Sequence, residues 1–149
     1  KNHVLVIIGN GDISNKLNFL ASKSKAQNHI FFIENTAPNE LQKLTPLADI
    51  GVSLEEDLGL NYRYALPNKL FDYIQAEVPV LVSDLPEMKK VVTQFNVGEI
   101  VMDRSPIALA KQIINFRHKK HSKELINAKE VLNWESQEKQ LLSTINNAV

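Results

Sequence analysis

Short apolar segments rich in β-branched residues alternate with segments of helical periodicity along much of this chain. The first, "HVLVIIG" at residues 3–9, is continuously apolar and ends in glycine, which is typical of a strand covered on both faces in a parallel sheet. Four similar runs follow: "HIFFI" (29–33), "DIGVSL" (49–54), "VPVLVS" (78–83) and "GEIVM" (98–102). Strands alternating with helices favour right-handed crossovers and an open parallel sheet. The pattern predicts an α/β fold, a Rossmann-like three-layer αβα sandwich with about five parallel strands.

The segments between and after these runs have the spacing of amphipathic helices. We expect helices at residues 17–25, 38–47, 68–76, 86–94, 107–116, 122–132 and 134–145. Residues 55–67 have no clean periodicity and are expected to form a long loop, including an insertion at residues 61–67 whose path the sequence does not define. Long loops within compact domains are usually functional or disordered, and Tyr62 and Tyr64 favour a functional one.

Length, charge and composition narrow the class of protein. The 149 residues are about one domain's worth of chain. The 17 basic and 17 acidic side chains cancel, so bulk charge indicates no nucleic-acid partner. The lack of cysteine excludes disulfides, and no apolar run approaches the roughly twenty residues of a membrane-spanning helix. We therefore expect a cytoplasmic protein. Because the first strand begins almost at residue 1, we also expect the chain to be an excised piece.

A ligand of an open parallel sheet binds beyond the carboxyl ends of the strands. That rule selects four loops, at residues 9–14, 34–38, 55–68 and 83–87. The first loop has Gly9 and Gly11, but Ser14 stands where the dinucleotide fingerprint has its third glycine. We expect this loop to be an ordinary tight turn that grips no pyrophosphate.

The helix that is expected to begin at Asn68 carries a cation, Lys69, at the positive end of its macrodipole. A bound anion would offset the unfavourable interaction, and free backbone N–H groups beside an ammonium form a natural phosphate site. Alternatively, Lys69 pairs with Asp72, since residues three apart share a helix face. The residues leave both interpretations open.

Acidic residues accompany this cation. Glu55, Glu56 and Asp57 follow the third strand, and Asp72 lies one turn into the helix. Carboxylates accept hydrogen bonds from hydroxyl groups, whereas lysine and helix N–H groups hold phosphate oxygens. A ligand with both features is a sugar nucleotide. The alternative is that the acidic run is a solvated loop.

Three segments, "ADIGVSLEEDLGL", "PNKLFDYIQAEVPVLVSDLPEMKKVV" and "NVGEIV", resemble the C-terminal, donor-binding half of GT-B glycosyltransferases of the large retaining group called family four. The resemblance covers nearly the whole chain. It implies the C-terminal domain type of the GT-B fold for residues 1–149, with the N-terminal acceptor domain absent. The reaction it implies is the transfer of a sugar from a nucleoside diphosphate to an acceptor hydroxyl in polysaccharide or glycoconjugate biosynthesis.

The resemblance also implies roles for individual residues. Those near the donor sugar or the diphosphate are Glu56, Gly59, Leu60, Asn68 and Lys69. Asp72 is implied to accept hydrogen bonds from the ribose hydroxyls, and the backbone of Ile33 and Glu34 to contact the base. No cofactor or metal is implied, and no catalytic residue is assigned within this chain.

The chain departs from the family's pattern in several places. Glu56 and Asp72 are 16 residues apart, twice the usual spacing, and Asp72 is one carbon shorter than the usual glutamate. Glu77 stands where the family mostly has glycine. The family's arginine and lysine that hold the diphosphate lie upstream of residue 1, so either Arg63 replaces them or it is a flexible surface side chain.

These expectations describe a glycosyltransferase donor domain that is inactive without its N-terminal domain. The intact enzyme has no expected transmembrane segment, and the resemblance leaves open a peripheral association with the inner face of the membrane. Two other functions stay in view. One is a sugar-nucleotide epimerase of the same architecture, which would need acid–base residues in the cleft. The other is a non-catalytic module that binds nucleotide sugars or a protein partner.

Overall fold

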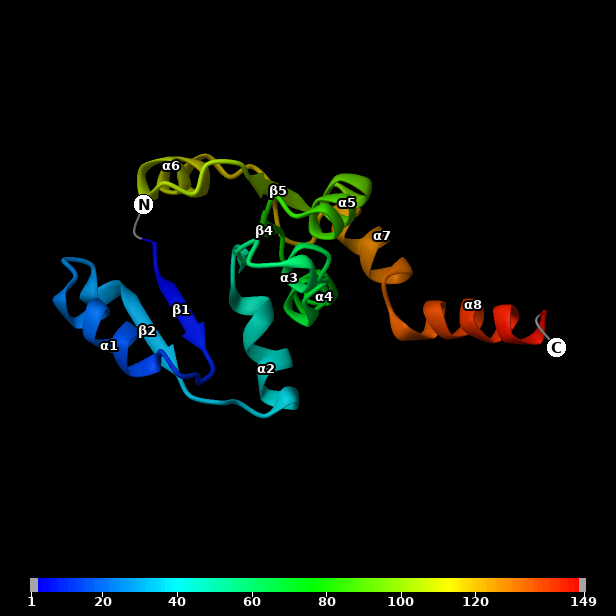
Figure 1. Ribbon diagram of the computed structural model, residues 1–149, viewed down its shortest axis with the longest axis horizontal. Coiled ribbons are helices and arrows are strands. Elements are labelled where there is room, and N and C mark those ends of the chain that lie inside the picture. The colour runs from blue at the N-terminus through cyan, green and yellow to red at the C-terminus, as the bar shows by residue number, and fades with distance from the viewer. Residues whose placement is uncertain (1–2, 148–149) are drawn as a thin grey trace. The chain divides into compact units, whose positions relative to one another are not determined.

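The computed structural model describes residues 3–147, with the side chain of Gln140 left out (Figure 1). The chain divides into two compact units, Lys1–Leu41 and Gln42–Val149, and each is described by itself. Helix α2 (Pro38–Leu44) runs across the boundary between them. Within residues 3–147, no helix combines the length and hydropathy needed to cross a bilayer.

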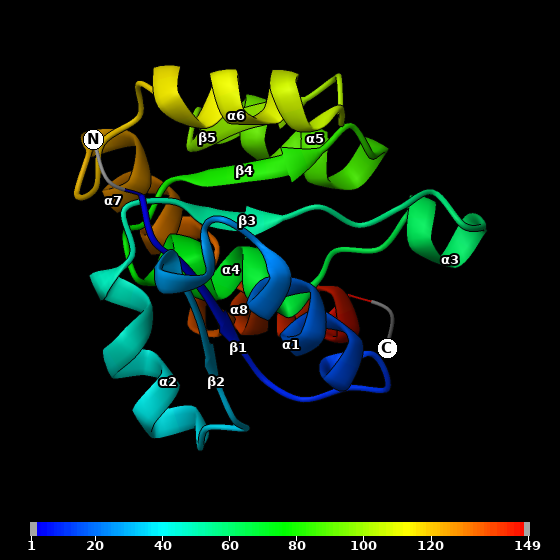
Figure 2. The same cartoon turned by 90° about the vertical axis from the view of Figure 1, so that its left-hand side faces the viewer.

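Unit 1 is a small βαβ element. Strand β1 (Leu5–Ile8) leads into helix α1 (Ser14–Lys23) and the 3₁₀ turn η1 (Gln27–His29), and strand β2 (Ile30–Ile33) follows. The two strands are parallel, with Leu5 opposite Ile30 and Ile8 opposite Ile33. Figure 2 shows α1 beside this pair of strands. The β-branched residues of both strands favour this extended conformation.

Unit 2 contains a three-stranded parallel sheet with the order β3-β4-β5. Its elements are η2 (Thr45–Leu47), β3 (Gly51–Ser53), α3 (Leu60–Arg63), α4 (Asn68–Gln75), β4 (Val80–Ser83), α5 (Pro86–Phe95), β5 (Gly98–Val101), α6 (Pro106–Asn115), α7 (Lys123–Val131) and α8 (Trp134–Asn146). The central strand β4 is buried along its whole length, which explains its continuous apolar sequence.

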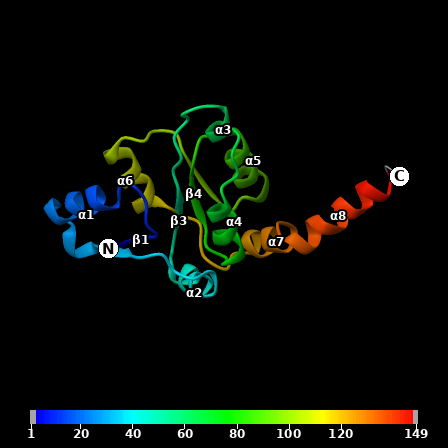
Figure 3. The same ribbon diagram turned by 60° about the horizontal axis from the view of Figure 1, so that its bottom comes forward.

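The hydrophobic core of unit 2 lies between β4 and the helices α4, α5 and α7. Its fully or nearly fully buried side chains are Leu70 and Ile74 of α4, Val80 and Val82 of β4, Met88, Val91 and Val92 of α5, and Leu125 and Ala128 of α7. Helix α6 lies on the opposite side of the sheet from α4 and α5 (Figures 1 and 3). Helix α8 extends away from the sheet of unit 2, and its Trp134 is 65% exposed.

Two glycines allow close approach within unit 2. A Cβ built at Gly51 would overlap the ring of Tyr73, which α4 places against β3. A Cβ built at Gly98 would overlap the carbonyl oxygen of Val80 in the neighbouring strand. The glycine in "DIGVSL" is therefore a packing requirement that holds the start of β3 against α4.

The predicted fold class is confirmed: residues 3–147 are α/β, with parallel sheets flanked by helices. Hydrogen bonds between the strands form one sheet of two strands and one of three, each within its own unit. Three expectations about the segments were wrong. The helix expected at residues 17–25 runs from Ser14 to Lys23. The segment at residues 55–67 contains the one-turn helix α3, and the helix expected to run to Leu47 ends at Leu44, with η2 after it.

Candidate functional site

Polar groups from four segments of unit 2 meet at the carboxyl edge of its sheet. They come from the loop after β3, from Ser83 at the end of β4, from the turn after β5 and from the first turn of α4. Parallel strands bring their carboxyl ends to one edge, so residues far apart in the sequence become neighbours there.

Helix α4 begins at Asn68, as the sequence predicted. Its N-cap residue is Pro67, in an extended conformation, and no side chain caps this end of the helix. Leu70 N–H donates to the Pro67 carbonyl at 3.0 Å, while the N–H groups at the very start of a helix have no intrahelical partner. The burial of Leu70 and Ile74, one turn apart, fixes this helix against the core. The backbone of Asn68 and Lys69 therefore opens a helix end suited to an anion.

The ammonium of Lys69 lies at the same edge. Its Nζ is 2.8 Å from Oε1 of Glu55, and the Ser53 hydroxyl donates to Oε2 of that carboxylate at 2.8 Å. Partial burial acts to raise the pKa of Glu55, but the hydrogen bonds from Lys69 and Ser53 outweigh it, and the pKa lies below its ordinary value. Lys69 thus pairs with Glu55, from a different segment, instead of with Asp72 as the alternative interpretation held.

Asp72 lies on α4, one turn after Lys69, and within residues 3–147 it takes part in no ion pair. Burial raises the pKa of its carboxyl group. Nothing in the described part of the chain compensates this cost of desolvation. The residue as a whole is exposed, so its carboxylate is open to a ligand, although the structure assigns it none.

The loop after β3 holds the other predicted residues. The side chain of Glu56 is 67% exposed at this edge. Gly59 has φ 153° and ψ 174°, a region that is essentially open to glycine alone, and its carbonyl accepts hydrogen bonds from the N–H groups of Tyr62 and Arg63. Gly59 therefore directs the chain into α3, of which Leu60 is the first residue.

Arg63, the suggested substitute for the family's upstream basic residues, is held by an acidic neighbour. Its Nε and Nη2 both donate to the Asp57 carboxylate, with the shortest distance 2.7 Å. This bidentate pair crosses the loop and fixes Asp57 against α3. Arg63 is therefore neither a free surface cation nor an unoccupied anion ligand.

The sequence assigned no role to two residues at this edge, Arg104 and Ser83, although Ser83 begins one of the four selected loops. Arg104, in the turn after β5, donates from Nη1 to the Glu55 carbonyl and from Nη2 to the Leu54 carbonyl, both at 2.8 Å. The Ser83 hydroxyl donates to the same Glu55 carbonyl at 2.6 Å. The only sequence signal for these contacts is that each residue lies at or just after the end of a strand.

Unit 1 has its own hollow, of about 570 Å³, at the carboxyl ends of β1 and β2. Gly9, Gly11, Ile33 and Glu34 are among its lining residues. The turn beside it uses its own N–H groups: Asn10 N–H donates to Oδ1 of Asn35 at 2.9 Å, and Gly11 N–H donates to the Ser14 hydroxyl at 2.8 Å. The second bond lies within the turn, and the first ties the turn to the loop after β2.

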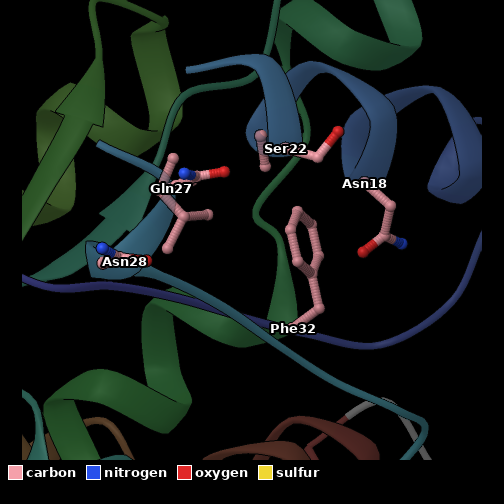
Figure 4. Close-up of a pocket in the computed structure, with 7 residues that line it drawn as sticks. Asn18, Ser22, Gln27, Asn28 and Phe32 are labelled. Atoms are coloured by element: carbon pink, nitrogen blue, oxygen red, sulfur yellow. The ribbon is translucent and has the colours of Figure 1, made fainter. Parts of the chain in front are cut away.

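A second hollow of unit 1, of about 280 Å³, is lined mainly by amide and hydroxyl side chains (Figure 4). Asn18 and Ser22 of α1 face it together with Gln27, Asn28 and the ring of Phe32.

Within residues 3–147, no group of three or more histidine and acidic side chains is arranged to hold a metal ion. The expectation that the reaction needs no metal stays a prediction.

Comparisons with known proteins assign the chain to a family. The family model described as glycosyl transferases group 1 matches residues 1–132. Among solved structures, the chain is similar to WaaG, a glycosyltransferase involved in lipopolysaccharide biosynthesis, with a TM-score of 0.56 and 17% sequence identity. The match covers 86% of this chain but 33% of the WaaG chain, and at this identity it shows the fold alone. No curated protein sequence matches significantly. On the family match, this chain belongs to the group 1 glycosyltransferases.

Proposed function

We propose that this chain provides the donor site of a retaining glycosyltransferase that uses a nucleoside-diphosphate sugar in polysaccharide or glycoconjugate assembly. The observation that carries the proposal is the convergence of Lys69 with the uncapped start of α4 at the carboxyl edge of the sheet. Membership of the group 1 glycosyltransferases supports it.

In this proposal, the N–H groups of Asn68 and Lys69 and the Lys69 ammonium bind the diphosphate. The backbone at Gly59 and Leu60 lies along it, and Glu56 accepts hydrogen bonds from the donor sugar. Asp72 accepts hydrogen bonds from the ribose hydroxyls. The backbone of Ile33 and Glu34 is proposed to contact the base. Both residues line the larger of the two hollows described in unit 1.

The proposed reaction breaks the bond between the anomeric carbon of the sugar and the phosphate oxygen. The diphosphate leaves with the electron pair, the acceptor oxygen forms the new bond to the anomeric carbon, and the acceptor hydroxyl loses its proton. The chain's part is to position the donor and to stabilise the negative charge that develops on the leaving group. Lys69 and the α4 dipole supply positive charge there, which is the role that a divalent metal has in other transferases.

The Lys69–Glu55 ion pair is compatible with this role. An ammonium has three N–H donors, so Lys69 can bind a phosphate oxygen while it keeps its contact with Glu55. The Lys69 side chain is 52% exposed, which leaves its ammonium accessible. Glu55 then acts as a tether that keeps the ammonium at the edge of the sheet.

Different observations bear on the two alternative functions. An epimerase needs acid–base groups in the cleft, but His3 and His29 precede strands, and His118 and His121 lie between α6 and α7. His121 pairs with Glu77, just beyond the C-terminal end of α4, at 2.7 Å. A module that binds only a protein partner is distinguished by the binding experiment below, because it would bind none of the nucleotides. The acceptor site and the catalytic base are proposed to belong to an N-terminal domain, and this chain alone is proposed to be inactive.

The test is calorimetric titration of the chain and its Lys69→Met variant with UDP, GDP and ADP. We expect one of the three nucleotides to bind, and the variant to bind it about tenfold more weakly, since one charge-assisted hydrogen bond contributes about 1.4 kcal/mol or more. Lys129→Met is the matched control. Lys129 pairs with Glu77 at 2.8 Å with similar exposure, but next to the other end of α4. Equal weakening by both substitutions, or no binding at all, would reject the proposal.

A further inference from the structure

The turn after β5 is built to hold one arginine in a fixed place. Asp103 Oδ1 accepts a hydrogen bond from Ser105 N–H at 2.8 Å, and the Ser105 hydroxyl caps α6 by accepting from Ala108 N–H at 3.4 Å. Pro106 follows at the first position of that helix. Arg104 lies between these two anchoring residues, so its side chain starts from a rigid backbone.

The guanidinium group of Arg104 reaches from β5 to the loop after β3. Its Nη1 and Nη2 donate to two consecutive carbonyls, those of Glu55 and Leu54, each at 2.8 Å. Because β4 lies between β3 and β5, the side chain crosses the carboxyl end of the central strand. Ser83, at that end of β4, donates to the Glu55 carbonyl as well. The loop after β3 is thus bonded to the end of β4 and to the turn after β5.

The segment that Arg104 holds carries two carboxylates of the candidate site. Glu55 contacts Lys69 and Ser53 through its two carboxylate oxygens. Glu56 directs Oε1 to within 4.0 Å of Arg104 Nη2. The direction of both side chains depends on the peptide units of residues 54–56, whose carbonyls Arg104 fixes.

We propose that Arg104 is a positioning residue of the donor site, which fixes the backbone of residues 54–56 so that Glu55 tethers Lys69 and Glu56 faces the donor sugar. This inference rests on the proposed function for its second part. The contact needs arginine, since its planar fork reaches two carbonyls at once, whereas one ammonium is a single point charge. Lysine at this position would keep the charge and lose the paired geometry.

The experiment compares the chain with Arg104→Ala and Arg104→Lys variants by ¹⁵N NMR relaxation and by titration with UDP, GDP and ADP. Arg117→Ala, an exposed arginine in the segment between α6 and α7, is the charge-matched control. Far-UV circular dichroism confirms that each variant is folded. We expect order parameters of about 0.85 for the amides of residues 54–56, as in rigid backbone, and a fall towards 0.6 in Arg104→Ala.

Nucleotide affinity should fall about tenfold in Arg104→Ala and by an intermediate factor in Arg104→Lys, with Arg117→Ala unchanged. Unchanged order parameters in Arg104→Ala would overturn the inference, and so would lower order parameters without any loss of affinity. If Arg104→Ala does not fold, the Arg104→Lys variant decides by the same two measurements. Failure of the unsubstituted chain to bind any of the three nucleotides would instead reject the proposed function, whatever the relaxation data show.

Discussion

Replacement of Gly51 by alanine tests how tightly α4 is packed against β3. Helix α4 carries Lys69, and strand β3 leads into the loop that carries Glu55. A Cβ at this position would lie 2.6 Å from Cδ1 of Tyr73 and closer still to Cγ and Cδ2. Rotation of the ring about the Cβ–Cγ bond leaves Cγ in place, so the overlap is relieved only if Tyr73 changes its χ1 rotamer or if the helix or the strand moves. Overpacking of this kind costs about 1 to 3 kcal/mol.

The overlap predicts a specific double-mutant cycle. Tyr73→Ala removes Cγ and the ring, so Gly51→Ala should cost almost nothing in that background, and the coupling free energy should be about 2 kcal/mol. Urea unfolding followed by circular dichroism measures it. With a slope of about 2 kcal/mol per molar urea, Gly51→Ala alone should lower the midpoint by about 1 M.

Gly11→Ala is the control for the loss of glycine itself. No atom lies within 4 Å of a Cβ built at Gly11, so this substitution should leave the midpoint unchanged or raise it slightly. Additive costs for Gly51→Ala and Tyr73→Ala would refute the packing of α4 on β3 described above. A midpoint for Gly51→Ala equal to that of Gly11→Ala would refute it as well.

Two further predictions concern carboxylates of unit 2. Partial burial raises the pKa of Asp72 above its ordinary value of 3.8, so the destabilisation by its charged form develops as pH rises to the folded-state pKa and is complete above it. Asp72→Asn should therefore keep or raise the urea midpoint at pH 7 while it weakens nucleotide binding, and a lower midpoint would show that Asp72 is structural. Side-chain hydrogen bonds, first from Lys129 and second from His121, hold the pKa of Glu77 below its ordinary value of 4.5. The contribution of the Glu77 carboxylate to folding stability is therefore present above that value and lost as pH falls through the folded-state pKa. Glu77→Gln should therefore lower the midpoint at pH 7 and reduce its fall on acidification to pH 3, and parallel midpoint curves for the two proteins would contradict this.

The helices and strands themselves could be predicted from local sequence patterns. The run "VPVLVS" predicted β4 because a strand buried on both faces needs continuous apolar residues. Helix α5 begins at Pro86, as predicted, and the helix expected from residue 107 begins one residue earlier, at Pro106. The start of α4 at Asn68 was predicted correctly for a similar reason, since the helical spacing of Leu70 and Ile74 begins there. These signals act over one or two helical turns, which is the range that a sequence pattern records.

The hydrogen-bond and ion-pair partners of the site residues could not be predicted in this way. The sequence offered Asp72 as the partner of Lys69, because helix geometry makes them neighbours, but the structure supplies Glu55 from beyond the α3 segment. The contacts of Arg104 join residues about fifty positions apart, and they depend on the strand order β3-β4-β5. Without that order, no spacing rule connects the turn after β5 to the loop after β3.

The structure explains why Glu77 departs from the family's pattern. It stands where the family mostly has glycine, and its backbone has φ 56°, the left-handed conformation that favours glycine. Its carboxylate accepts hydrogen bonds from Lys129 at 2.8 Å and contacts His121 Nδ1 at 2.7 Å. These two contacts offset the backbone strain, and both partners lie more than forty residues further along the chain.

The most direct test of the account is a ¹H–¹⁵N NMR titration of the chain with inorganic pyrophosphate and with the best-binding nucleoside diphosphate. If the start of α4 holds the leaving group, the largest shift changes for both ligands should fall on the amides of Asn68 and Lys69, and they should shrink in Lys69→Met. Saturable binding whose largest changes lie elsewhere, with these two amides unmoved, would contradict the central claim.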